Sequence, residues 1–89
     1  MGLDIVEFVL ATEKAFDLSL PDAELGSITT VGEFTDLVHK KLIEKHGENQ
    51  PLSNEMVFAK IKTLLVKMQG LQENNILRSS RFVQDLKMD

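Results

Sequence analysis

The chain has 89 residues, enough for one hydrophobic core and too few for two domains. With 43% apolar and 27% charged residues it has the composition of a folded, soluble protein. It contains no cysteine, which excludes disulfide frameworks and thiolate metal sites. No apolar run approaches the about 20 residues that a membrane span needs, and the first residues lack the basic flank and apolar stretch of a signal peptide. We therefore expect a cytoplasmic protein without a membrane span.

The charge is unevenly distributed along the chain. The net charge is −4, but residues 1–36 hold eight acidic residues and one basic residue, a net −7. Residues 37–89 hold six acidic and nine basic residues, a net +3. An acidic surface disfavours nucleic acid as a partner and suits a basic protein surface. Taken alone, the asymmetry is equally compatible with a role in solubility.

Apolar periodicity predicts three long helices, over residues 4–16, 31–46 and 54–69. Between the first two, a helical turn or two is expected after Pro21, ending at Gly26. Thr30 and Glu33 have the spacing of a capping box at the start of the second long helix. The side chains expected to form one core are Phe8, Phe16, Phe34, Val38, Ile61, Leu65 and Phe82. These features predict an all-α fold, a small bundle of three long helices and one short helix.

Two stretches lack helical periodicity. Residues 47–53 are polar, with glycine and proline near the ends, and are typical of a linker. Its seven residues can reach at most about 25 Å. Residues 71–89 are expected to form a long loop, a kind of segment that is usually functional when it occurs in a compact domain. The expected apolar anchors of that loop are Ile76, Leu77, Phe82, Val83 and Leu86.

Both halves of the chain resemble acyl carrier proteins, in exchanged order. Residues 3–22 contain L-D-I-V-E-F, E-K-A-F-D and L-P-D, which are similar to the D-S-L-D, V-E-L, E-x-x-F-D and I-P-D of that family's second helix. Residues 56–70 resemble the family's first helix, and residues 76–89 resemble the loop that follows it, typically I-T-P-x-S-S-F-x-x-D-L-G-x-D. In the family the latter segment comes first, so this chain resembles a circularly permuted carrier.

The resemblance implies a single acyl-carrier-like domain over residues 1–89. Residues 1–46 would correspond to family helices two to four, residues 47–53 to a linker, and residues 54–89 to the first helix and long loop. The family's first helix runs antiparallel to the second and last ones, so the linker has only a short distance to cover. Two chains that exchange halves could make the same contacts, so a monomer and a swapped dimer both remain open.

The family attaches phosphopantetheine to the serine before the motif's leucine, and this chain has Gly2 there. The resemblance implies that Gly2, Leu3, Asp4 and Asp89 surround the attachment position. Glycine keeps the backbone donors of a helix start but has no nucleophile, so we expect the chain as written to carry no phosphopantetheine. Asp89 and its carboxylate are expected to help cap the first helix. Gly2→Ser is expected to be accepted, because serine is favoured at a helix start.

The role implied by the family is not enzymatic. Acyl carrier proteins carry acyl chains on phosphopantetheine in fatty acid or polyketide biosynthesis. Their partners, synthase enzymes and the phosphopantetheinyl transferase, would dock through a basic surface. The docking residues on the first helix would be Asp4, Val6, Glu7, Leu10 and Glu13, with Leu3 beside them. The alternative is a cargo-free protein-interaction module that uses the same acidic helix.

Departures from the family pattern and the remaining polar residues add little chemistry. Lys14 replaces a usual acid on the docking helix, and Lys87 replaces a usual glycine. No acid–base pair or activated nucleophile indicates an enzyme. His39 and His46 lie seven residues apart and are better explained as solvent-facing than as metal ligands. Two other candidate attachment serines, Ser79 and Ser80, match the family's structural serine pair instead.

Overall fold

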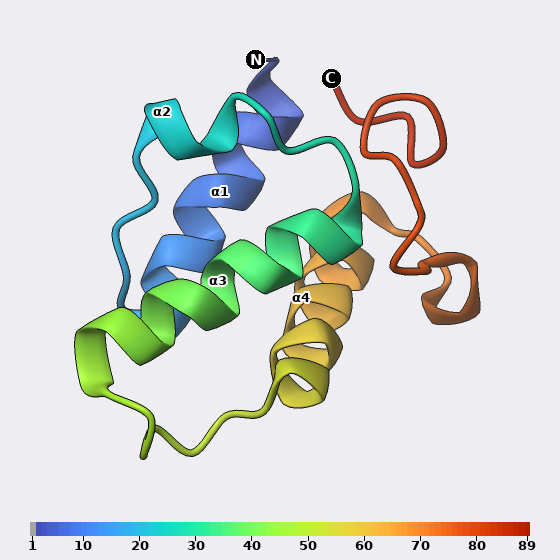
Figure 1. The fold of residues 1–89 in the computed structure, drawn as a ribbon. Helices are drawn as coiled ribbons and strands as arrows, with labels where there is room; N and C mark the ends of the chain where they lie inside the picture. The colour runs from blue at the N-terminus through green and yellow to red at the C-terminus, as the bar shows by residue number, and fades with distance from the viewer. Residues whose placement is uncertain (1) are drawn as a thin grey trace.

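The computed structural model describes residues 2–89, which form four α-helices and one 3-10 turn (Figure 1). Three helices are long and one is short, as the sequence predicts, and the predicted bounds agree to within one residue. The elements are α1 (Leu3–Phe16), α2 (Asp22–Leu25), α3 (Val31–His46), α4 (Asn54–Gln69) and the turn η1 (Glu73–Asn75). Within residues 2–89 the one β-type pairing is an isolated antiparallel bridge between Thr30 and Arg81. The predicted all-α bundle is therefore confirmed.

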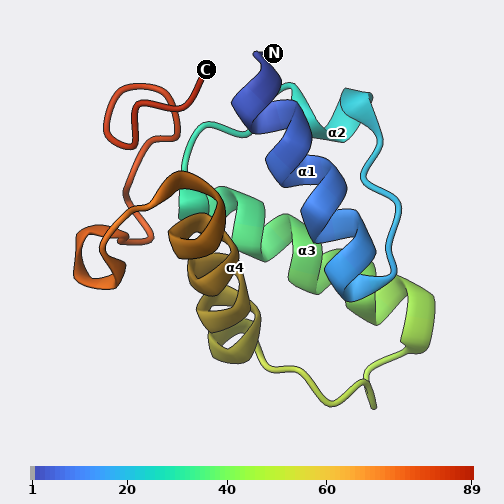
Figure 2. The ribbon, with the colours of Figure 1, turned by 180° about the vertical axis from the view of Figure 1, so that it is seen from behind.

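Helix α4, the last long helix in sequence, packs against both α3 and α1 (Figure 1). Seen from behind, α1 lies in front of α3 and the linker runs below both to the start of α4 (Figure 2). The short α2 is attached through buried Leu25 and through the carboxylate of Glu24, which lies 2.6 Å from Lys41 Nζ on α3. This ion pair raises the pKa of Lys41 above its ordinary value. None of the helices described is long and apolar enough to cross a membrane.

The starts of α3 and α4 are fixed by local side-chain caps. Thr30 Oγ1 accepts a hydrogen bond from Glu33 N at 3.2 Å, and Glu33 Oε1 accepts one from Thr30 N at 3.0 Å. The predicted capping box is therefore present in both directions. Ser53 Oγ accepts from Met56 N at 3.2 Å and caps α4. The helix α4 ends at Gly70, whose φ of 67° lies in the left-handed region that favours glycine.

One apolar core joins all parts of the chain. Each of the seven side chains predicted for the core is at most 7% exposed. Phe8 from α1, Phe34 from α3 and Phe82 from the C-terminal segment form a triangle of rings, with centroids 5.1 to 5.8 Å apart. Such aromatic contacts add to the stabilisation from burial. Residues on both sides of the linker therefore contribute to one core within a single chain.

The C-terminal segment, residues 71–89, has no α-helix but is firmly attached. Its buried anchors include Ile76, Phe82, Leu86 and also Met88, which the sequence pattern did not indicate. The expectation that Leu77 and Val83 are anchors is wrong, because they are 57% and 56% exposed. In irregular backbone no fixed period tells which of two neighbouring apolar residues faces inward.

Backbone hydrogen bonds fasten this segment to the start of α3. Val31 N donates to Ser80 O at 2.9 Å, and Gly32 N donates to Arg78 O at 2.7 Å. Phe82 N donates to Thr29 O at 3.0 Å. The bonds from Val31 and Gly32 satisfy N–H groups of the first turn of α3 that have no partner within the helix.

Candidate functional site

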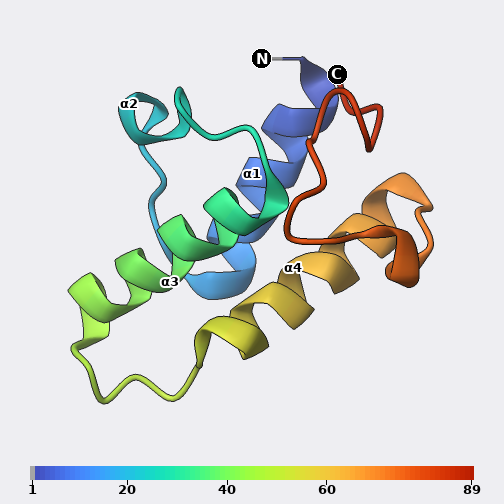
Figure 3. The same ribbon diagram turned by 45° about the vertical axis from the view of Figure 1, so that its right-hand side comes forward.

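The last residue described, Asp89, lies against the start of α1 (Figure 3). Gly2 is the N-cap residue of α1 and provides no side-chain cap. Instead, Ile5 N donates to Asp89 O at 3.1 Å, and Asp89 N donates to Asp4 Oδ2 at 3.4 Å. The expected capping of α1 by Asp89 is therefore present. Asp89 therefore lies next to Gly2 and Asp4 at the start of α1.

Asp89 also occupies the space that a side chain at Gly2 would need. An ideal Cβ on Gly2 would lie 1.9 Å from Asp89 C and 2.4 Å from Asp89 O. Cβ atoms do not approach other heavy atoms so closely, so any larger residue must displace Asp89. Gly2→Ser, which we expect the fold to accept, therefore requires that Asp89 move away from the start of α1. Serine is favoured at a helix start, but Asp89 fills the place that the serine side chain would take.

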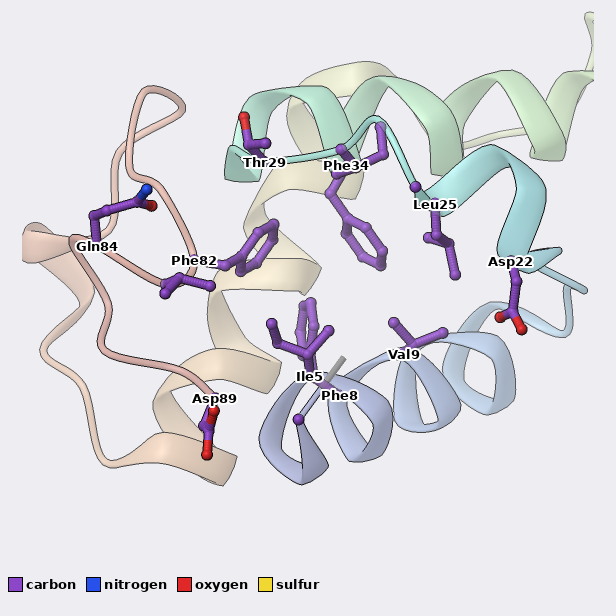
Figure 4. Close-up of a pocket in the computed structure, with 14 residues that line it drawn as sticks. Ile5, Phe8, Val9, Asp22, Leu25, Thr29, Phe34, Phe82, Gln84 and Asp89 are labelled. Atoms are coloured by element: carbon purple, nitrogen blue, oxygen red, sulfur yellow. The ribbon is translucent and has the colours of Figure 1, made fainter.

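An apolar cavity of about 440 Å³ opens beside Gly2 (Figure 4). Its apolar wall comes from α1, α2, the start of α3 and the C-terminal segment, and includes Ile5, Val9, Leu25, Ile28, Phe34 and Phe82. Several of these side chains point toward one another across the cavity, whereas Asp22, Thr29, Gln84 and Asp89 lie around it (Figure 4). The volume falls in the usual range for small-molecule sites. Chemically, the cavity suits an apolar chain and offers no general acid or base in its centre.

The outer face of α1 presents apolar and acidic side chains together. Leu3 is 75%, Val6 36% and Leu10 58% exposed, and the carboxylate of Glu7 lies beside them on the exposed helix surface. Large apolar side chains gathered on one exposed face are typical of interaction surfaces. We call Leu3, Val6, Glu7 and Leu10 the acidic face of α1.

Glu13, also expected on this face, has a different environment. Its Oε2 accepts a hydrogen bond from Leu20 N at 2.7 Å, and the residue is half-buried. The side chain thus fastens the connection between α1 and α2. A contact with the backbone seven residues onward has no local sequence signal, so the sequence did not indicate it.

The remaining serine, lysine and histidine residues singled out from the sequence do not form a reactive site. Ser80 is buried and its Oγ accepts from Leu77 N at 2.9 Å, whereas Ser79 is exposed. Lys87 has a φ of 59°, in the region that favours glycine, at the position where the family usually has glycine. His39 is half-buried on α3 and His46 is exposed at its end. Across residues 2–89, no three His, Asp or Glu side chains gather in a way that could hold a metal ion.

Two exposed carboxylates at the junction between α3 and the C-terminal segment have lowered pKa values. The backbone N–H of Thr29, followed by that of Thr30, lowers the pKa of Glu33 below its ordinary value. The side chain of Arg81 lowers the pKa of Asp85, whose two oxygens lie 3.1 Å from Nε and a terminal guanidinium nitrogen. Both carboxylates accept backbone N–H hydrogen bonds near this junction, Glu33 from Thr29 and Thr30 and Asp85 from Arg81.

Comparison with known proteins shows similarity to carriers over about half the chain. The chain is 42% identical over 44 residues to the acyl carrier protein of Amoebophilus asiaticus, covering 49% of this chain and 55% of that protein. It is 40% identical over 51 residues to that of Cyanidioschyzon merolae, covering 55% and 56%, and 47% identical over 39 residues to that of Syntrophobacter fumaroxidans, covering 44% and 48%. No protein-family model and no solved structure matches the chain. The chain spans about half the length of the curated relatives it matches, so what the comparisons establish is a similarity to acyl carrier proteins, which are named as carriers and not as enzymes.

Proposed function

We propose that this chain is a cytoplasmic, acyl-carrier-like domain in circularly permuted order, and that it carries no phosphopantetheine as written. The role of the family is to carry acyl chains on that group in fatty acid or polyketide biosynthesis. The observation that carries the proposal is the contact of Asp89 with Gly2 and Ile5 at the start of α1, beside an apolar cavity.

This contact supports the permuted order, because it places residue 89 next to residue 2. The end of the chain reads D-L-K-M-D and its start continues G-L-D, which together resemble the family's D-L-G-x-D-S-L-D. The resemblance depends on Asp89 lying directly before Gly2, and the 3.1 Å hydrogen bond from Ile5 N to Asp89 O supports that neighbourhood. The linker, residues 47–53, would then be the new connection that permutation requires.

The residues at this position do not fit a covalently attached phosphopantetheine. Gly2 has no hydroxyl to form the phosphodiester bond, and Asp89 fills the space next to its Cα. The apolar cavity beside it has the volume and lining for an acyl chain. The cavity thus supports a carrier ancestry, while Gly2 and Asp89 argue against covalent loading.

A second candidate, a cargo-free interaction module, is favoured by the occupied position at Gly2. Such a module would act through the acidic face of α1 on family synthase enzymes or on the transferase, through their basic surfaces. Glu7→Lys should then slow association with such an enzyme and flatten its salt dependence, with little change in stability. Lys14→Glu, which adds an acid on the same helix, should act in the opposite direction. Association that ignores both substitutions and salt would contradict this docking surface.

The test of covalent loading is the intact mass after incubation with coenzyme A and a broad-specificity phosphopantetheinyl transferase. We expect no gain in mass for the chain as written. A gain located at Ser79 or Ser80 would overturn the unmodified reading. The transferase is checked in the same experiment with an ordinary acyl carrier protein.

The test of permutation is a rearranged chain, in which residues 54–89 are followed directly by residues 2–46. If the halves are permuted, this chain should fold with the same helix content, since Asp89 and Gly2 already adjoin. Adding Gly2→Ser to it should permit loading with one phosphopantetheine, and the rearranged chain that keeps Gly2 is the matched control. A rearranged chain that is unfolded would contradict the permutation, whatever the result for loading.

A further inference from the structure

A second concave surface lies away from Gly2, between α4, η1 and the start of the C-terminal segment. It has a volume of about 590 Å³ and is open to solvent on one side. Glu73 lines it with an exposed carboxylate 3.7 Å from Lys62 Nζ. Four other lining residues, Phe58, Lys62, Leu77 and Arg78, combine an aromatic ring, two cations and an exposed apolar side chain. We call these four residues the basic groove.

Both cations of the basic groove are held over the ring of Phe58. Lys62 Nζ lies 4.8 Å and Arg78 Cζ 4.5 Å from the ring centroid, distances at which cation–π attraction operates. The ring therefore restricts two side chains that would otherwise be mobile. Less conformational entropy is then lost when either cation binds an anion.

Arg78 is additionally fixed through its backbone. Its carbonyl oxygen accepts from Gly32 N at 2.7 Å, and a Cβ on Gly32 would lie only 2.8 Å from that oxygen. None of the ion pairs within residues 2–89 includes Arg78, and Lys62 has only the exposed Glu73 at 3.7 Å. A positioned guanidinium without a carboxylate suits a carboxylate from outside.

The groove is also partly apolar, which restricts the kind of partner it fits. Leu77, one of its lining residues, is 57% exposed, and the ring of Phe58 adds further apolar surface. A matching partner therefore combines carboxylates with exposed aliphatic side chains. The acidic face of α1 has this combination, with Glu7 set among Leu3, Val6 and Leu10.

We propose that the basic groove of one copy of this chain binds the acidic face of α1 of a second copy. The two surfaces are different, so the contact is head-to-tail and can either extend or close into a ring. Each copy has a net charge of −4, but this repulsion is screened beyond about 8 Å at physiological salt, whereas the facing charges lie within contact range. We expect weak association that falls as salt rises. An enzyme that docks on the acidic face would compete with it, so the proposal goes beyond the carrier role.

The association can be measured by sedimentation velocity from about 10 μM to about 1 mM protein. Larger species should appear at about 150 mM salt, where the repulsion between the net charges is screened, and diminish at about 1 M salt, where the contact charges are screened as well. The groove variant Lys62→Glu with Arg78→Glu should weaken association at least about tenfold. Its matched control is Lys60→Glu with Lys67→Glu, which reverses two exposed cations of the same helix outside the groove and should change association less than about twofold.

A mixing experiment distinguishes loss of the groove contact from misfolding of the groove variant. The variant Glu7→Arg keeps the groove and loses the acidic face, whereas the groove variant keeps the acidic face. Each alone should be monomeric, and the mixture should form one-to-one pairs. A chain that is monomeric up to about 1 mM at about 150 mM salt, or equal association of the groove variant and its control, would overturn the proposal. Salt-insensitive dimers would also overturn it, because they indicate exchange of helices.

Discussion

The starts of α1 and α3 show two different ways of completing a helix. At α3 the acceptors belong to Thr30 and Glu33, three residues apart, and their bonds of 3.0 to 3.2 Å form a closed local pair. At α1 the N-cap Gly2 offers no side chain, and the acceptor for Ile5 N is Asp89 from the other end of the chain. One start is specified by a tetrapeptide, and the other exists only once the whole chain has folded.

Both starts nevertheless depend on the same C-terminal segment. Arg78 and Ser80 accept hydrogen bonds from the first turn of α3, and Asp89 accepts one from the first turn of α1. Between these contacts Phe82 inserts its ring against Phe8 and Phe34. The segment therefore acts as a brace between two helices, although it contains no α-helix itself. We expect four changes to lower the free energy of unfolding by successively smaller amounts: loss of the segment's anchor, of its α3 contact, of its α1 contact, and of the local cap of α3.

Removal of the shared anchor should have the largest effect. Phe82→Ala empties the place of a buried ring that contacts both Phe8 and Phe34, and such truncations cost about 3 to 5 kcal/mol. Urea unfolding followed by circular dichroism would measure the loss. The control Val83→Ala changes an exposed neighbour and should stay within about 0.5 kcal/mol. Equal effects of the two substitutions would show that the segment is not a brace.

Substitution at Gly32 tests the α3 contact alone. A Cβ there would lie 2.8 Å from Arg78 O and 3.2 Å from Arg78 Cβ, so Gly32→Ala must push the segment away. We expect a loss of about 1 to 3 kcal/mol in the free energy of unfolding, typical of overpacking. Gly26→Ala is the control, because its nearest neighbouring atom is 3.8 Å away and its φ is −60°. It should be neutral or stabilise by about 0.5 kcal/mol, through a less flexible unfolded chain.

The helices, caps and core were predictable because their signals are local. Apolar spacing of three and four residues determines which side of a helix is buried, so Phe8, Phe34 and Ile61 could be assigned from sequence alone. The spacing of Thr30 and Glu33 likewise indicated the capping box. In the C-terminal segment that reasoning fails, and Leu77 proved to be exposed where Met88 is buried.

The candidate site was predictable only in part. The resemblance predicted that Asp89 lies near Gly2. It did not predict that a Cβ at Gly2 would collide with Asp89, because that depends on the path of the last residues. The bond from Leu20 N to Glu13 and the cation–π contact of Arg78 with Phe58 also join residues that do not share a helix. Such contacts follow from tertiary structure, and neither periodicity nor capping rules contain them.

Two substitutions at Gly2 distinguish the cap that Asp89 provides for α1 from a cap by a side chain at residue 2. Gly2→Ala should displace Asp89 and supply no acceptor in exchange, costing about 1 kcal/mol. Gly2→Ser should displace Asp89 equally but offer its own hydroxyl as a cap, so its net cost should be only a few tenths of a kcal/mol. Hydrogen exchange at Ile5 N and unfolding in urea would together measure both effects. Equal losses for alanine and serine would indicate that the hydroxyl does not reach the helix start.

The smallest expected effect concerns the local cap of α3, and it depends on pH. Hydrogen bonds from the backbone of Thr29 and Thr30 lower the pKa of Glu33 in the folded state below its unfolded value of about 4.3. Its ionised form therefore stabilises the fold above that value, and this contribution is lost as the pH falls through the folded pKa. Glu33→Gln retains an acceptor oxygen but no charge, so it should be less stable than the unmutated chain at pH 7, and the gap should narrow on acidification.

The measurement is a series of urea midpoints between about pH 7 and about pH 3. Asp85, whose pKa Arg81 also lowers, remains in the variant, so both chains should still lose stability in acid. The contribution of the Glu33 charge is therefore the difference in stability between the unmutated chain and Glu33→Gln. Glu48→Gln, in the exposed linker, provides the matched control and should follow the unmutated chain at every pH. A gap for Glu33→Gln that stays constant with pH would contradict the role of its charge. The cap of α3 would then rest on hydrogen-bond geometry alone.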